Sequence, residues 1–156
     1  MSANTTNHPA ARSWNLEGLY ELGEDLSIVS EPEGGRVESF KDLWVWKHGM
    51  QLVKEVYLVT RKMPKEELYG LTSQLRRASV SVPSNIAEGW GRNKTGYLLL
   101  GMSYARGSLH EIETQLLICV ELEFITHQEV KPILDHMGAI SVGLLRFMNK
   151  LETKKR

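Results

Sequence analysis

Residues 74–92, QLRRASVSVPSNIAEGWGR, decide the fold expected for this chain. At helical spacing, this stretch and the leucine three residues before it divide into two stripes. The apolar stripe comprises Leu71, Leu75, Ala78, Val82, Ile86 and Trp90. The polar stripe comprises Arg77, Ser81, Asn85, Glu88 and Arg92. The first stripe predicts burial in a helical bundle, and the second is the best candidate for a recognition surface.

Pro83 lies in the middle of this helical pattern. A proline inside a helix removes one backbone hydrogen bond and costs about 3 kcal/mol unless the chain bends. We therefore expect a kinked second helix, bent just before Pro83. The backbone carbonyls freed around Ser79 and Val80 would then accept hydrogen bonds from a neighbour.

Residues 41–63 predict a first helix with two apolar sets. The set assigned to the core consists of Leu43, Trp46, Met50, Val53, Tyr57 and Thr60. The second set consists of Val45, Leu52, Val56 and Val59. Together they make an apolar arc wider than one bundle core requires, so we assign the second set to a contact between subunits.

Two further helices are predicted by apolar residues at the same spacing of three and four positions. Asn93 or Thr95 is placed to cap the third helix, which is expected to end near Glu123. Thr126 and Glu129 have the spacing of a capping box that starts the fourth helix. Small residues in the first half of the third helix allow another backbone to approach, and these are Gly101, Ala105, Gly107 and Ser108.

Four helices, short connections and the lack of a strand pattern predict an all-α fold, an up-down-up-down four-helix bundle over residues 40–156. Residues 1–39 are expected to form an acidic leader and linker, with one short helical pattern at residues 14–29. Residues 13–39 have a net charge of −6, against +5 for residues 40–156. Such a split is typical of a chain that binds a polyanion or covers its own basic surface, although two solvated faces explain it equally well.

Composition excludes several classes of protein. A chain of 156 residues with 42% apolar residues suits one globular domain. No apolar run is long enough to span a bilayer and no secretory signal is evident, so we expect a cytoplasmic protein without a membrane partner. The lone Cys119 cannot form an internal disulfide, and its apolar neighbours favour a buried side chain over a reactive thiol.

The sequence contains no recognisable catalytic, metal or cofactor motif. Histidines in a di-iron bundle follow a glutamate by three residues, and none of the five histidines does so. One cysteine cannot build a cysteine zinc site, and neither a nucleophile elbow nor a phosphate loop is present. Glu88 and Arg92, four residues apart, are most simply an ion pair.

Nucleic-acid binding is a more specific hypothesis for the function than any catalytic or metal-binding role. The side chains expected to contact phosphates are Arg76, Arg77, Arg92, Lys94 and Arg106. Repeated around an oligomer, they would form a ring of positive charge that releases counterions from a phosphate backbone. Trp44, Trp46 and Trp90 are candidates for stacking on bases, although core positions explain Trp46 and Trp90 as well.

Residues 40–133 also resemble a known family, most specifically in the pieces LTSQLR (71–76), NIAEG (85–89) and ARGSL (105–109). The pattern is similar to a four-helix-bundle family that includes proteins encoded in intervening sequences of bacterial ribosomal RNA genes. Its distant relatives are the accessory variability proteins of diversity-generating retroelements. The resemblance implies a barrel-shaped homopentamer and no catalytic group. It implies motif positions of undefined role, which include Asn85, Glu88 and Gly89.

For the retroelement relatives, the resemblance implies a partner of a reverse transcriptase that binds RNA and DNA without being an enzyme. We therefore expect a non-enzymatic oligomeric scaffold that binds nucleic acid, RNA in the first place. The alternative is a structural or protein-interaction module without nucleic-acid binding. The acidic leader departs from the short members of the family and leaves room for a further protein partner.

Overall fold

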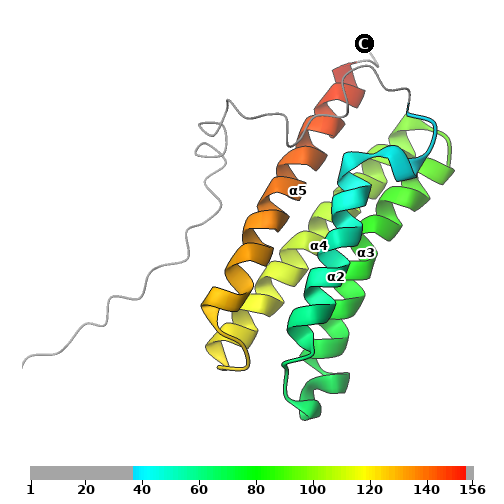
Figure 1. Cartoon of the computed structure of the whole chain (residues 1–156). Helices are drawn as coiled ribbons and strands as arrows, with labels where there is room; N and C mark the ends of the chain where they lie inside the picture. Colours follow the sequence, from blue (N-terminus) through cyan, green and yellow to red (C-terminus); the bar gives the residue numbers. More distant parts are fainter. Residues whose placement is uncertain (1–36, 154–156) are drawn as a thin grey trace, which may run out of the picture.

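Four long helices account for most of residues 37–153, which are the part of the chain that the structure, a computed structural model, describes. They are α2 (Trp44–Thr60), α3 (Leu71–Gly91), α4 (Thr95–Glu121) and α5 (His127–Thr153). Two 3-10 turns, η2 (Phe40–Asp42) and η3 (Lys65–Tyr69), precede α2 and α3. Figure 1 shows the four helices packed side by side, with the start of α2, the end of α3 and the start of α4 at one end of the bundle. The all-α four-helix bundle is confirmed, while the helical pattern predicted at 14–29 lies outside the described residues.

Helix α2 is shorter than the expected 41–63 at both ends, because residues 40–42 form the 3-10 turn η2 and the last turn of α2 tightens. The N–H of Lys62 donates to the carbonyl of Val59 and that of Met63 to the carbonyl of Thr60, which are bonds of the 3-10 type. Pro64 then leads into η3. The carboxylate of Glu67 accepts the backbone N–H of Leu71 at 3.0 Å, and this bond satisfies one free donor at the start of α3.

Helix α3 continues without a break through Pro83. One of the carbonyls predicted to be freed, that of Val80, accepts the hydroxyl of Ser84 at 2.8 Å and is therefore bonded within its own helix. Pro83 also faces Gly49 of α2, where an added Cβ would lie 3.5 Å from the proline ring. The proline thus fills the space against the neighbouring helix at a point where that helix has no side chain.

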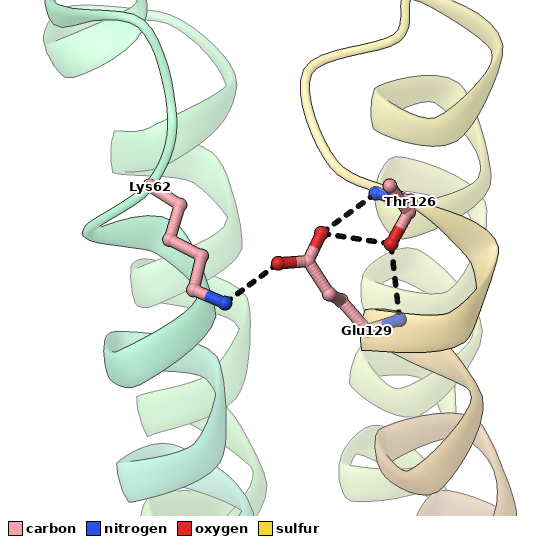
Figure 2. A network of polar contacts seen from close by, with 3 residues as sticks. All are labelled: Lys62, Thr126 and Glu129. Atoms are coloured by element: carbon pink, nitrogen blue, oxygen red, sulfur yellow. Dashed lines mark hydrogen bonds and ion pairs between the residues drawn. The ribbon is translucent and has the colours of Figure 1, made fainter.

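The capping box predicted at the start of α5 is confirmed. The carboxylate of Glu129 accepts the N–H of Thr126 at 2.9 Å, and the hydroxyl of Thr126 accepts the N–H of Glu129 at 3.4 Å. Figure 2 shows that Lys62, which follows α2, reaches the other carboxylate oxygen at 2.6 Å. Glu129 therefore caps the start of α5 and also links it to the chain just after the end of α2.

The predicted cap of α4 is wrong. The residue before α4 is Lys94, whose side chain makes no capping hydrogen bond. Asn93 instead follows the end of α3, with a positive φ of 52° and its N–H bonded to the carbonyl of Trp90. Asparagine tolerates this left-handed conformation, so it ends one helix where a cap for the next was expected.

The two apolar sets of α2 differ from the prediction, since the first set is buried only at Leu43 and Thr60. The set assigned to a subunit contact is buried in the core of the single chain, and its members are Val45, Leu52, Val56 and Val59. In the set assigned to the core, Met50 is 47% and Tyr57 40% exposed, and Trp46 is half-buried. Both sets recur at helical spacing, so periodicity alone does not distinguish them. The wholly aliphatic set is the buried one, because the rings of Tyr and Trp carry a polar atom that favours a boundary with water.

Candidate nucleic-acid interface

The polar stripe of α3 is divided between a seam with α4 and the outer surface. The hydroxyl of Ser108 on α4 lies 3.0 Å from that of Ser81, which also accepts the side-chain amide of Asn85 at 2.9 Å. Arg77, Glu88 and Arg92 are exposed. Of the polar stripe, only the charged residues Arg77, Glu88 and Arg92 are therefore available on the outer surface for recognition.

Gly89, one of the motif positions of undefined role, lies where α3 and α4 cross. A Cβ added to Gly89 would lie 2.8 Å from the backbone carbonyl of Tyr97, and a Cβ on Gly101 would lie 2.4 Å from that of Asn85. Real side chains do not approach a backbone so closely. The glycines therefore allow the helices to touch, which gives the Asn85 to Gly89 motif a packing role. The expectation of close approach is met at Gly101, whereas a Cβ on Gly107 would meet nothing within 4 Å.

Three exposed cations lie on α3 or in the turn that follows it, two at the corner where α3 leads into α4 and one near the start of α3. The guanidinium of Arg92 donates to Glu88 and lies over the ring of Tyr97, 5.2 Å from its centroid. The hydrogen bond that Arg92 donates to Glu88, together with the charge of the same carboxylate, raises the pKa of Arg92. Lys94 is exposed beside it, and Arg77 is exposed further along α3. Arg77, Arg92 and Lys94 form what we call the cationic surface.

Arg76 does not belong to that surface. Its Nε donates to the hydroxyl of Thr60 at 3.0 Å, and its guanidinium lies over the ring of Tyr57 at 4.8 Å. These contacts direct it toward α2. Sixteen residues separate Arg76 from Arg92, which is about 24 Å along a helix axis. Arg76 therefore links two helices, and it lies far from Arg92 and Lys94 although Arg77 is the next residue of α3.

Arg106 is also directed away from the cationic surface. It follows Tyr104 by two residues, which places it about 200° further around α4. Its side chain is half-buried, and its Nε atom is enclosed without a hydrogen-bond partner. The structure thus leaves three of the five predicted phosphate contacts exposed on α3 and the turn after it, with Arg77 well separated from Arg92 and Lys94.

Sequence reasoning missed a stripe of exposed apolar side chains beside these cations. On α4, Tyr97 is 42% and Tyr104 58% exposed, with Leu100 exposed between them. The tryptophans considered for stacking instead pack partly buried against the core, and these are Trp44, Trp46 and Trp90. The signal was available, because the tyrosines are seven residues apart on the helix, each directly before a residue of the apolar heptads.

A polar cluster between α2 and α5 was missed as well. The Nδ1 of His48 lies 2.9 Å from the Nε2 of His136, whose Nδ1 lies 2.9 Å from the carboxylate of Glu55. An ionised carboxylate only accepts, so His136 donates from Nδ1 to Glu55. The ring of Trp44 stacks on His48 with centroids 3.8 Å apart. Burial lowers the pKa of His48, the charge of His136 adds to the effect and that of Glu55 opposes it.

The cluster ties two helices together and does not resemble a metal centre. Both nitrogens of His136 are engaged by protein groups. Within residues 37–153, no group of three or more His, Cys, Asp or Glu side chains is placed to hold a metal ion. Cys119 is buried, and desolvation raises the pKa of its thiol to about 11, which keeps it protonated.

Comparison with known proteins identifies the family. No helix among the described residues is long and apolar enough to cross a membrane. A search of curated proteins found no match. The family model of the 23S rRNA-intervening sequence proteins matches residues 41–145, which is more than half of the chain and includes the cationic surface and the α3–α4 crossing. The chain therefore belongs to the 23S rRNA-intervening sequence protein family.

Proposed function

We propose that this protein is a non-enzymatic, oligomeric scaffold that binds nucleic acid, RNA in the first place, through α3 and the start of α4. The distribution of charge carries the proposal. Residues 71–110 contain five Arg or Lys side chains and a single acidic one, Glu88. Such an excess of cations binds a phosphate backbone by releasing its counterions. Membership of a family named for an intervening sequence of ribosomal RNA favours RNA as the ligand.

The cationic surface supplies the phosphate contacts of this proposal. Arg77 and Arg92 lie on one stripe of α3, about 22 Å apart along the helix axis, and Lys94 extends it toward α4. Contacts of cationic side chains with phosphates position a nucleic acid without reading its bases. The binding is therefore expected to depend on charge and shape more than on sequence.

The assembly of the proposal uses the exposed part of α2. Met50 and Tyr57 are exposed there, and Val80 of α3 is exposed as well. The guanidinium of Arg76 over Tyr57 places the two helix surfaces next to each other. A second subunit that covers these side chains would build an oligomer, for which the family resemblance implies five copies. The cationic surface would then be repeated around a ring.

Two further roles belong to the same proposal. Action as the accessory subunit of a reverse transcriptase in a retroelement follows from the distant relatives alone. The alternative, a protein-interaction module without nucleic-acid binding, is favoured by the exposed apolar residues of α2, which by themselves explain an oligomer.

The test is RNA binding by a variant in which Arg77, Arg92 and Lys94 are each replaced by Glu. The three side chains are exposed, so the variant is expected to fold. At about 50 mM salt we expect its affinity for RNA to fall by at least about 100-fold, with a shallower dependence on salt. Arg76 is left unchanged, because its replacement would disturb the contact with α2.

The matched control replaces Lys41, Lys47 and Lys54 by Glu. These lysines are exposed on η2 and α2, so the net charge changes equally at another surface. The control is expected to bind within a few-fold of the wild type. An equal loss in both variants would show that net charge alone matters, and a wild type that binds no RNA would leave the protein-interaction alternative. Light scattering on the same samples tests the assembly, which a monomer at micromolar concentration would refute.

A further inference from the structure

The outer face of α4 carries two groups of exposed apolar side chains. Tyr97, Leu100 and Tyr104 lie near its start and are 42%, 46% and 58% exposed. Leu117, Ile118 and Leu122 lie near its end. At 3.6 residues per turn, the first three lie within about 60° of one another around the helix. They form one continuous strip, which we call the tyrosine stripe.

The two groups differ in the charges around them. No acidic residue occurs between Glu88 and Glu111, so the tyrosine stripe has no carboxylate on its own half of α4. The second group is aliphatic and is flanked by Glu121 and Glu123. A polyanion would be repelled from the second group and not from the first.

The cationic surface adjoins the tyrosine stripe. The guanidinium of Arg92 lies over the ring of Tyr97, so a phosphate bound by Arg92 would lie close to that ring. Lys94 is exposed three residues before Tyr97. A phosphate held by these cations would place the attached base within reach of the aromatic ring.

The spacing of the rings matches separate bases. Seven residues separate Tyr97 from Tyr104, which is about 10 Å along the helix axis. One base cannot contact both rings at this distance, so each tyrosine is a platform of its own. Leu100 supplies apolar surface between the two.

We propose that the tyrosine stripe stacks unpaired bases, and that the ligand class is single-stranded RNA or the single-stranded part of a folded RNA. This inference deepens the proposed function and rests on it. Aromatic side chains stack on every type of base, so the contact requires no particular sequence. Bases in a duplex are covered by their neighbours, so the stripe contributes to the binding of single strands only.

The experiment compares two double variants of the full chain on two RNA probes. In one variant Tyr97 and Tyr104 are replaced by Leu, and in the other by Phe. The probes are a single-stranded RNA of about 12 nucleotides and the same strand annealed to its complement. The leucine variant is expected to lose at least about tenfold in affinity for the single strand and to keep the salt dependence of the wild type. Its affinity for the duplex is expected to be unchanged, and the phenylalanine variant should bind both probes like the wild type.

Each other outcome decides against the stacking. An unchanged single-strand affinity in the leucine variant, or an equal loss on both probes, overturns it while RNA binding through the cationic surface stands. A change in particle mass by light scattering would show instead that the stripe is covered by a second copy of the chain. A wild type that binds neither probe overturns the stacking and the proposed function together. In that case the glutamate variant of the cationic surface shows no loss of RNA affinity either.

Discussion

The α3–α4 pair and the α2–α5 pair of this bundle are held together in different ways. At the first, Gly89 and Gly101 bring two backbones into contact, and the fit depends on the absence of side chains. At the second, His48, His136 and Glu55 form a chain of hydrogen bonds. The first contact is insensitive to pH, whereas the second depends on protonation. The candidate surface for nucleic acid lies on the α3–α4 pair, whose arrangement is fixed by the close packing of two backbones.

The contrast also separates two kinds of motif residue. The fragments NIAEG and ARGSL, which carry much of the family resemblance, lie on the helices that cross. Gly89 has a packing role there, and Ser108 of the second fragment bonds across the seam. The cationic surface is carried by the same helices but makes few contacts within the chain. Residues that define the family pattern thus fix the position of residues that face the solvent.

The largest expected effect comes from filling the α3–α4 contact. Replacement of Gly101 by Ala places a Cβ 2.4 Å from the backbone carbonyl of Asn85, which cannot rotate away. The helices must separate, so we expect the free energy of unfolding to fall by about 2 to 3 kcal/mol. Chemical denaturation measures the change.

The matched control lies on the same helix. A Cβ on Gly107 meets nothing within 4 Å. Replacement of Gly107 by Ala is therefore expected to raise the stability by about 0.8 kcal/mol through helix propensity alone. If the two substitutions shift stability in the same direction by similar amounts, the contact at Gly101 does not control the α3–α4 pair.

A smaller loss is expected when the α2–α5 chain of hydrogen bonds is broken. Replacement of His136 by Leu leaves His48 and Glu55 without this partner in a half-buried site. We expect chemical denaturation to show a loss of about 1 to 2 kcal/mol, because partly buried polar groups then lack a hydrogen bond.

The same site makes stability depend on pH. Burial lowers the pKa of His48 below 6.5, so the folded chain takes up this proton less readily than the unfolded chain. The associated stability is complete above about pH 6.5 and is lost as the pH falls from there through the lowered pKa. Denaturation curves between about pH 7.5 and pH 5.5 should show this decline in the wild type and a weaker one in a variant with His48 replaced by Gln. An undiminished decline in that variant would assign the effect to other groups.

Features of this fold that are local in sequence were predictable. The apolar stripe of α3 and the pairing of Thr126 with Glu129 involve residues a few positions apart, and helical periodicity and capping rules describe such spacings. The helix count follows from them. The end of α2 and the cap of α4 were missed, because a 3-10 turn and the left-handed Asn93 are alternatives that local rules rank poorly.

Features that depend on a partner helix were not predictable. Met50 and Leu52 belong to two different sets that both recur at helical spacing, and Leu52 is the buried one. Only the positions of the neighbouring helices decide which set is covered. His48 and His136 are 88 residues apart, so no local rule joins them.

The cationic surface was predictable in part. Charge is visible in sequence, and Arg77, Arg92 and Lys94 are exposed, while their contact with phosphates stays a prediction. The directions of Arg76 and Arg106 depend on the helices that pack beside them, so the sequence alone grouped these two with the others.

The smallest expected effect concerns the far end of the α2–α5 pair, where Thr126, Glu129 and Lys62 meet (Figure 2). Replacement of Thr126 by Ala removes the helix cap and is expected to cost about 1 kcal/mol. Replacement of Lys62 by Met should cost less, because solvent screens an exposed ion pair.

These two substitutions can be separated by the titration of one carboxyl group. The hydrogen bond from Lys62, followed by those from Thr126, lowers the pKa of Glu129 to about 2. The stability that this carboxylate contributes is present above its ordinary pKa of 4.5 and is lost as the pH falls toward 2. Carboxyl titration by NMR should therefore show a higher pKa in both variants, with the larger rise when Lys62 is replaced. A pKa that stays low without Lys62 would mean that the capping box alone holds the carboxylate, and that the Lys62–Glu129 ion pair does not join this end of α2 and α5.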